Sequence, residues 1–289
     1  MASYRIYNAK LASLRSMRRV TKTMQMVSAT KLRKAQAAEQ KAAQFTERLQ
    51  TAAAQFLGAV DVQAHPLMQH RAPLRNGLLL VLSSDKGLCG GFNSNLIRRV
   101  GQWLDENRPR FHLVRASFCG RRAFSALKGQ VEVRNLFDDI VARPTFQAAR
   151  RLGLELIDSF MAGHYDRVYM AYNAFINAAA QEPRVVRLLP VADDILPRNA
   201  SPTAASYLFD PGAADMLDLF LRKMICYSIY TALLNNAAGE HGARMTAMDS
   251  ATTNVDNLAV RYTKLRNQAR QSSITGELIE IISGAEALK

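Results

Sequence analysis

Glycine and proline are scarce outside the middle of the chain. No glycine precedes Gly58, no proline precedes Pro66 and no proline follows Pro211 among the 289 residues. Because these two residues are the strongest helix breakers, nearly all helix-interrupting positions lie in the middle of the sequence. The distribution therefore predicts three parts, which are a helix over residues 1–57, a mixed domain over 58–212 and a second helix over 213–289.

Cysteine is also scarce, with three widely scattered residues at Cys89, Cys119 and Cys226. An odd number without paired spacing argues against a disulfide framework or a zinc site and favours a reducing compartment. The five histidines are equally dispersed. No uninterrupted apolar run reaches the about 18 residues that a membrane-spanning helix needs, so we expect no direct membrane insertion.

Acidic residues are nearly absent from the first part of the chain. Residues 1–57 carry 11 basic and 2 acidic side chains, residues 213–289 carry eight of each, and the net charge of the whole chain is +14. A basic surplus predicts an anionic partner, which could be nucleic acid, a membrane surface or an acidic protein. An arginine-rich start also resembles a mitochondrial transit peptide, but the helical pattern continues unbroken to residue 57.

Residues 3–57 predict one helix, which would be about 80 Å long at 1.5 Å per residue. Two apolar runs in it have coiled-coil spacing, Met17, Val20, Met24 and Val27, then Ala38, Ala42, Phe45, Leu49, Ala52 and Phe56. The 11-residue step from Val27 to Ala38 should unwind the supercoil locally. Met24 is expected to pack in the core of the coiled coil.

Residues 213–285 predict a second long helix, with Asp210 as its cap and Pro211 just inside its start. Gly239 and Gly242 are a weak point, and two shorter helices joined there remain an alternative. The apolar stripe of this helix comprises Leu217, Leu221, Met224, Ile225, Met245, Met248, Thr252, Val255, Leu258, Tyr262, Leu265 and Ala269.

The two helices differ in length, which has a geometric consequence if they pair antiparallel. With residue 57 beside residue 213, Met1 lies opposite about residue 268, so the last 20 or so residues have no partner in the chain. An exposed apolar end is unfavourable in water and should be covered by another protein. The apolar residues of this end are Ile274, Leu278, Ile281, Ile282 and Leu288.

The middle part alternates strand and helix patterns, which predicts a small Rossmann-like α/β domain with a largely parallel sheet. The predicted strands are Gly77–Ser83, Phe111–Ser117, Arg167–Tyr172 and Arg184–Leu189, and the predicted helices are Phe92–Asn107 and Arg143–Ala162. The fold class is therefore α/β, with a long antiparallel coiled coil of the terminal helices attached to this domain.

A glycine-rich loop over Ser84–Asn93 follows the first predicted strand and opens a helix. Such a loop can hold a phosphate at the helix N-terminus. Its spacing matches neither GxxxxGK[ST] nor GxGxxG, so a tight turn that needs close backbone packing is the favoured interpretation.

The same loop, read as the string DKGLCGGFN over Asp85–Asn93, resembles the gamma subunit of F-type ATP synthases. Further matches to that family occur in family order along essentially the whole chain. They are Val20–Val27, Tyr207–Pro211, Ala243–Met248 with Ala251 and Thr252, and, as the most specific, Asn267–Ala285. Gly239, His241, Gly242 and Gly276 depart from the usual family pattern.

The resemblance implies a rotor shaft without catalytic residues or cofactors, turned by transmembrane proton or sodium flow. Its implied partners are the alpha and beta subunits of the catalytic head, the epsilon subunit and the membrane c-ring, at the cytoplasmic face of a bacterial inner membrane. Some basic residues of the first helix would meet carboxylates of the head, and others would form a solvated helix face. These basic residues include Arg15, Arg18, Arg19, Lys22, Lys31, Arg33 and Lys34. The residues that the resemblance implies as coupling contacts are Lys22, Met24, Arg244, Arg270, Gln271 and Thr275. The regulatory cysteine pair of chloroplast members is absent, so no thiol switch is expected.

Two other functions fit parts of the sequence. An enzyme with a nucleotide site in the α/β domain would lack a phosphate-binding lysine, a metal cluster and a nucleophile–base pair. A nucleic-acid-binding coiled coil suits the basic first helix but not the electroneutral second helix or its apolar end. Measurable ATP binding by the isolated chain would favour the first, and a salt-dependent gel shift with mixed DNA would favour the second.

Overall fold

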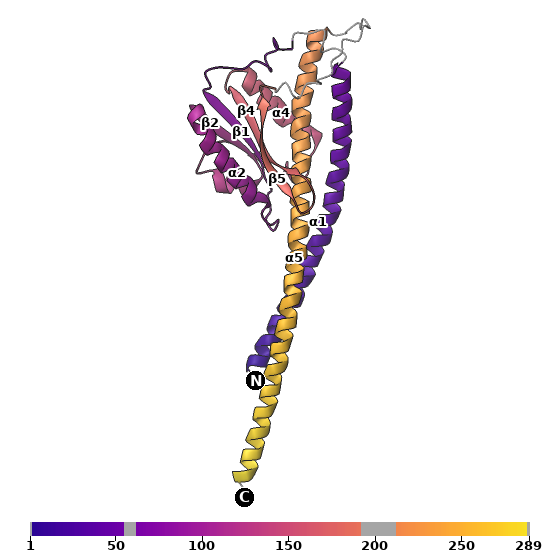
Figure 1. Ribbon diagram of the computed structural model, residues 1–289, viewed down its shortest axis with the longest axis vertical. Helices are drawn as coiled ribbons and strands as arrows, with labels where there is room; N and C mark the ends of the chain where they lie inside the picture. The colour runs from indigo at the N-terminus through magenta and orange to yellow at the C-terminus, as the bar shows by residue number, and fades with distance from the viewer. Residues whose placement is uncertain (1, 55–61, 192–211, 288–289) are drawn as a thin grey trace. The chain divides into compact units, whose positions relative to one another are not determined.

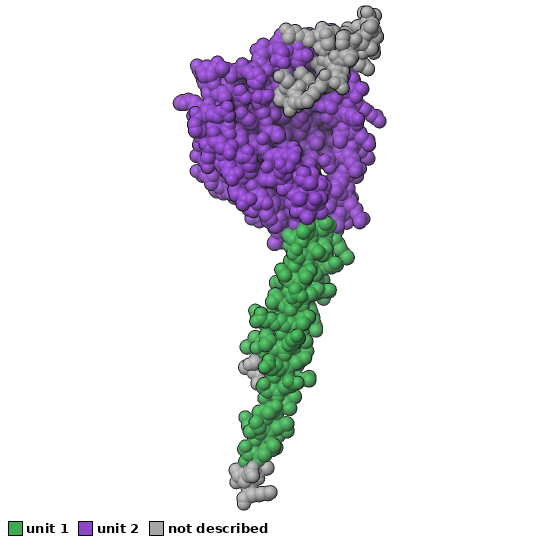
Figure 2. Space-filling view, viewed as in Figure 1, with its two compact units in different colours: residues 1–28, 244–289 green, residues 29–243 purple. Residues whose placement is uncertain are grey.

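The computed structural model describes residues 2–54, 62–191 and 212–287 of the chain (Figure 1). They form two compact units, unit 1 from residues 1–28 and 244–289 and unit 2 from residues 29–243 (Figure 2). The predicted cap Asp210, the residue Pro211 and the family match at Tyr207–Pro211 lie outside the described residues, as do Phe56 and Leu288 of the predicted apolar positions.

Unit 2 contains a five-stranded sheet in the order β3-β2-β1-β4-β5. Strands β1 to β4 run parallel to their neighbours, and only β5 pairs antiparallel, with β4. The strands are β1 (Asn76–Leu82), β2 (Leu113–Cys119), β3 (Glu132–Phe137), β4 (Arg167–Phe175) and β5 (Gln181–Leu189). The largely parallel sheet that the sequence predicts is confirmed.

Helices cover both faces of this sheet. They are α2 (Phe92–Asn107), α3 (Arg121–Leu127) and α4 (Phe146–Met161), and a single 3-10 turn, η2 (Arg108–Arg110), follows α2. Because side chains alternate along a strand, Leu79 and Val81 of β1 pack with α2 and α3, whereas Leu78 and Leu80 pack with α4 and the C-terminal helix. Burial on both faces explains why β1 is an unbroken apolar run.

The two long helices are α1 (Ala2–Ala54) and α5 (Ala213–Ala287). The helix α5 continues through Gly239 and Gly242, so the alternative of two shorter helices is wrong. Helix α4 begins at a side-chain cap, because the Thr145 hydroxyl accepts a hydrogen bond from the Ala148 N–H at 3.2 Å.

In unit 1 the two long helices pair antiparallel. The hydroxyls of Thr21 and Thr252 lie 2.7 Å apart, and the rings of Tyr7 and Tyr262 lie 6.2 Å apart. At this register the first residue of α1 lies opposite about residue 270 of α5. The predicted position, about residue 268, is close to this, and α5 extends beyond the end of α1 as expected.

The first apolar run on α1 was predicted in the wrong position, whereas Ala42 of the second run is buried and Leu49 packs against the core. Met17, Val20 and Val27 are exposed, and Met24 is half-buried rather than packed in a core. The buried residues of α1 are Leu11, Leu14, Thr21, Ser28, Leu32 and Ala42. These positions fit one continuous heptad pattern, so the predicted 11-residue step is wrong too. The reason is that Thr21 and Ser28 occupy seam positions that apolar periodicity alone passes over.

The stripe on α5 was predicted better. Leu217, Leu221 and Met224 are buried in unit 2, and Met248, Thr252 and Val255 are buried in unit 1. Leu258 is an exception, because its side chain is exposed.

Two short elements, α3 and β3, were not predicted. The strand β3 is an edge strand whose side chains are mostly only half-buried, so its sequence lacks a clear apolar alternation. Helix α3 has seven residues, too few for a helical period to stand out.

Candidate coupling surfaces

The six residues that the sequence suggested as coupling contacts all lie in unit 1, two on α1 and four on α5. Lys22 is exposed and Met24 is half-buried. Arg244 is buried, with 8% of its surface accessible. The other three, Arg270, Gln271 and Thr275, are exposed.

These residues do not form a single site. Arg244 and Arg270 lie 26 positions apart on one continuous helix, which corresponds to about 39 Å at 1.5 Å per residue. Lys22 and Met24 lie near residues 249 to 252 of α5, as the contacts of Thr21 and Gln25 show. The structure thus separates one group around Lys22 and Met24 from a second group around Gln271.

A polar seam between α1 and α5 was missed at the level of sequence. Arg18 forms an ion pair with Asp256 at 2.6 Å, and the Gln25 amide donates to Asp249 at 2.7 Å. The Thr21–Thr252 hydrogen bond lies between these two contacts. The signal was present, because these polar residues follow heptad spacing on both helices, and such contacts fix the register of a coiled coil.

Two apolar surfaces of unit 1 are exposed. One is the α1 stripe of Met17, Val20 and Val27. The other is the α5 end beyond α1, where Ile281 and Ile282 keep 68% and 61% of their surface accessible. Ile274, Leu278 and Ile279 are exposed on the same end. Contiguous exposed apolar surface of this kind marks a protein interaction site.

Unit 2 carries a basic hollow of about 310 Å³. Lys31 and Lys34 from α1, Arg143 from the loop before α4 and His241 from α5 line it, around a floor that includes Ala38 and Leu234. None of the residues that line this hollow is acidic. The arrangement favours a carboxylate-bearing partner, because several positive charges converge there at a partly apolar surface.

The glycine-rich loop forms a turn, with positive φ at Leu88 (62°) and Gly90 (55°). The Ser84 hydroxyl donates to the Lys86 carbonyl at 2.7 Å, and the Asn93 amide donates back to Ser84 Oγ at 2.8 Å. These bonds close the loop on itself, as the turn interpretation requires.

A carboxylate of the glycine-rich loop caps the neighbouring helix α3. Asp85 Oδ1 accepts a hydrogen bond from the backbone N–H of Arg121 at 3.1 Å. A phosphate bound in the loop would be repelled by the Asp85 carboxylate. The geometry therefore disfavours a nucleotide site in the loop.

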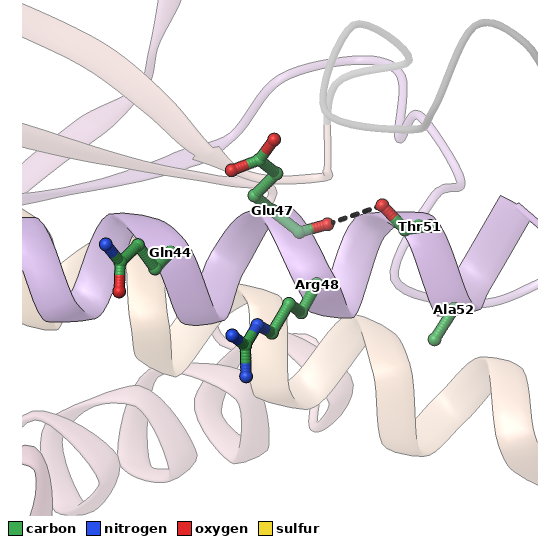
Figure 3. Close-up of a pocket in the computed structure, with 5 residues that line it drawn as sticks. All are labelled: Gln44, Glu47, Arg48, Thr51 and Ala52. Atoms are coloured by element: carbon green, nitrogen blue, oxygen red, sulfur yellow. Dashed lines mark hydrogen bonds between the residues drawn. The ribbon is translucent and has the colours of Figure 1, made fainter.

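A second hollow, on α1 of unit 2, is lined by Gln44, Glu47, Arg48, Thr51 and Ala52 (Figure 3). All five residues come from one helix. The Thr51 hydroxyl donates to the Glu47 carbonyl at 3.0 Å, a bond within the helix. Figure 3 shows Glu47 and Arg48 pointing away from each other, so no set of donors converges on a ligand.

Within the described residues, no group of three or more His, Cys, Asp or Glu side chains could hold a metal ion. None of the described helices combines the length and the apolar character that a bilayer crossing requires. Cys89, Cys119 and Cys226 are buried, and burial raises the pKa of the Cys119 and Cys226 thiols. Neither thiol is therefore activated as a nucleophile.

Comparison with known proteins gives a match over nearly the full chain. The family model described as ATP synthase matches residues 3–288. The chain is 36% identical to the ATP synthase gamma chain of Trichlorobacter lovleyi over 289 residues, and 38% identical to that of Anaeromyxobacter sp. (strain Fw109-5) over 293 residues. Both alignments cover all of each chain.

Solved structures agree with these matches. A chain of the central stalk and c-ring of the Tetrahymena thermophila mitochondrial ATP synthase aligns with a TM-score of 0.60 and 26% identity, over 80% of this chain and 99% of that chain. A chain of the Euglena gracilis mitochondrial ATP synthase aligns with a TM-score of 0.69 over 99% of this chain and 95% of that chain. Its 19% identity supports the fold alone.

Proposed function

The chain belongs to the ATP synthase gamma-chain family, and from this we propose that it is the central rotor shaft of an F-type ATP synthase. In this role it couples transmembrane proton or sodium flow to ATP synthesis or hydrolysis in the surrounding catalytic subunits. Its partners are the alpha and beta subunits of the head, the epsilon subunit and the c-ring.

The mechanism follows from differences between the faces of the α1–α5 pair. One face carries the apolar stripe of Met17 and Val20, and polar contacts such as Arg18–Asp256 lie elsewhere on the pair. As the shaft turns, each catalytic subunit meets a different face in turn. A face that contacts one subunit conformation better than another shifts that subunit toward it, and so changes its nucleotide affinity.

The shaft itself performs no chemistry in this proposal. The glycine-rich loop is closed by its own side chains and by Asp85, and the buried thiols Cys119 and Cys226 have raised pKa values. Bond formation and cleavage in ATP then belong to the catalytic head.

Contacts with the head form at two levels along the pair. Lys22, Met24 and Arg244 belong to one level, and Arg270, Gln271 and Thr275 belong to the other, where an exposed face can donate several hydrogen bonds together. In unit 2, the basic hollow with Lys31 and Lys34 receives acidic side chains of the moving catalytic subunits. Exposed ion pairs contribute only about 0–1 kcal/mol each, which suits contacts that form and release in every cycle.

The α/β domain over residues 58–212 serves as the foot that receives torque from the c-ring, while residues 1–57 and 213–289 form the shaft. The protein is then a peripheral component at the cytoplasmic face of a bacterial inner membrane. The bacterial origin of the gamma chains that it resembles over their full length supports this placement.

The exposed apolar end of α5 is the observation that carries the proposal. Exposure of Ile281 and Ile282 to water is unfavourable in an isolated chain. Surrounding subunits of an assembly would bury both side chains. At about 25 cal/mol per Å² of apolar surface, burial of both side chains stabilises the assembly by roughly 2–5 kcal/mol.

Co-purification tests the proposal. A tagged chain expressed with its host complex should bring down alpha and beta head subunits together with a small epsilon-like subunit. The double variant Ile281→Asp/Ile282→Asp should weaken recovery of the head subunits, because two buried charges would replace two buried side chains.

The matched control is Asn257→Asp, an exposed position on the same helix, which should leave recovery unchanged. If the parental chain brings down neither head subunits nor an epsilon-like subunit, the rotor assignment is wrong.

A further inference from the structure

The sheet of unit 2 has a crevice where related folds hold their ligands. The chain order reverses between the neighbouring strands β1 and β4, because β2 and β3 lie on one side of β1 and β4 lies on the other. In doubly wound sheets, ligands bind outside the carboxyl ends of the strands at such a reversal. In this protein the long helix α5 occupies that place.

Asn236 of α5 reaches the end of β1. Its side chain is fully buried, and its amide donates to the Ser83 carbonyl, the first residue after β1, at 3.2 Å. On β4, the buried Asn173 donates to the Phe92 carbonyl at 3.2 Å and so ties the start of α2 to the same crevice. A side-chain amide of α5 thus lies at the end of β1, next to the point where the strand order reverses.

Asn235 reaches the end of β4. Its Oδ1 accepts a hydrogen bond from the Phe175 N–H at 3.1 Å, and its amide donates to Glu39 of α1 at 3.1 Å. One side chain therefore holds the sheet, α5 and α1 together.

Two glycines explain how α5 comes so close. A Cβ at Gly239 would lie 2.9 Å from Phe92 Cε2. A Cβ at Gly242 would lie 3.0 Å from Ala178 Cα, in the turn between β4 and β5. Each glycine costs roughly 0.5–1 kcal/mol of helix stability relative to alanine, so close approach to the sheet is the reason for their presence.

We propose that Asn235, Asn236, Gly239 and Gly242 form a crevice joint, which fixes the angle of α5 about its own axis against the sheet and transmits torque between them. The proposal rests on the rotor function and deepens it. The helix α5 of the same chain takes the position that a ligand occupies in related folds.

The hydrogen bonds of the joint restrict the angle of α5 more than they stabilise the fold. Apolar packing is non-directional, whereas hydrogen bonds prefer a narrow range of angles. Asn236 Oδ1 has no hydrogen-bond partner among the described residues, which costs about 1–3 kcal/mol for a buried acceptor. The Asn236 amide nevertheless satisfies the buried Ser83 carbonyl, an acceptor that an apolar residue would leave without this bond.

The test compares complexes containing the parental chain, Asn235→Ala or Asn236→Ala, after reconstitution into lipid vesicles. ATP hydrolysis without an ion gradient and ion pumping against an imposed gradient are both measured. We expect hydrolysis without load to stay at the parental rate, while ions pumped per ATP under load fall at least twofold. Asn254→Ala, at an exposed position of the same helix outside the joint, should leave both values unchanged.

A role in folding alone predicts a different result. It would reduce the amount of assembled complex and leave the pumped ions per ATP at the parental value, which would overturn the proposal. If Asn236→Ala does not assemble, Gly242→Ala tests the same joint through its contact with Ala178. Failure of the parental chain to join any complex would instead contradict the rotor function, so the two failures are distinguishable.

Discussion

At the scale of residues, the thiols and the histidines show how burial sets chemistry in this chain. Cys119 is fully inaccessible, and Cys89 and Cys226 expose 2% and 3% of their surface. Burial raises the pKa of the Cys119 thiol, and the neighbouring carboxylates Asp85 and Glu155 raise it further. Since the thiolate is the reactive form and reagents need access to the sulfur, these buried thiols should be unreactive in the folded state.

Titration with an aromatic disulfide reagent at neutral pH should therefore detect essentially no thiol in the native chain. After unfolding in guanidinium chloride, all three cysteines should react. Rapid reaction of one thiol in the native protein would show that its site opens more readily than the packing indicates.

His65 gives the chain a defined response to acid. Its Nδ1 accepts the Leu67 N–H at 3.2 Å, and its Nε2 lies 3.3 Å from Asp218 Oδ1. Burial lowers the pKa of His65, and the Arg222 charge lowers it further, which together outweigh the raising effect of Asp218. The unfolded chain then binds a proton near pH 6.5 that the folded chain does not, so the stability from His65 is present above about pH 6.5 and is lost as the pH falls below it.

The variant His65→Gln removes this titration. The free energy of unfolding should fall less steeply in the variant than in the parental chain between about pH 7 and about pH 5. Urea titrations at several pH values measure this, with His112→Gln at an exposed position as control. Parallel pH profiles for the parental chain and His65→Gln would contradict the expectation.

At the scale of elements, close packing between helices is decided by glycine. A Cβ at Gly153 of α4 would lie 2.7 Å from Cys226 Sγ and 3.3 Å from Cys226 Cα on α5. A Cβ at Gly101 of α2 would meet nothing within 4 Å. Replacing glycine by alanine should therefore have opposite effects on stability in these two helices.

Gly153→Ala should destabilise the protein by about 1–3 kcal/mol, because the backbone of α5 would have to move. Gly101→Ala should stabilise it by about 0.5–1 kcal/mol through its better helix propensity. Chemical denaturation of both variants measures the difference. Equal shifts in the same direction would show that α4 and α5 adjust freely to each other.

The pairing of α1 with α5 shows the limit of sequence patterns at this scale. Apolar spacing placed the seam on Met17, Val20, Met24 and Val27, one position away from the true heptads. Thr21 pairs with Thr252 in the seam, and an apolar pattern gives such a pair no weight. Long elements were predicted well, since many residues share in each pattern, but the buried face of α1 required the partner helix.

At the scale of the whole molecule, an exposed apolar end and a net charge of +14 have opposite effects on association. Charge repulsion keeps copies of the chain apart, whereas exposed Ile281 and Ile282 favour burial against another surface. Salt screens the first effect within a Debye length of about 8 Å at physiological ionic strength and leaves the second intact.

The isolated chain should therefore self-associate more strongly as salt concentration rises. Ile281→Asp/Ile282→Asp should remove this association and shift the midpoint of thermal unfolding by less than about 2 °C, because both side chains are exposed in the single chain. Analytical ultracentrifugation measures the association. If the double variant associates as strongly as the parental chain, the associating surface lies elsewhere, for example at Met17 and Val20.

The sequence by itself determined where helices can be long, since proline is confined to the middle and glycine is sparse outside it, and it determined the parallel strands through their short apolar runs. It also identified the apolar end of α5, because periodicity continues there past any partner in the chain. Only the tertiary structure decided which face of α1 is buried and where the residues proposed as coupling contacts lie relative to one another. It alone showed why α5 tolerates Gly239 and Gly242. These features depend on contacts between residues far apart in the chain, which no local pattern records.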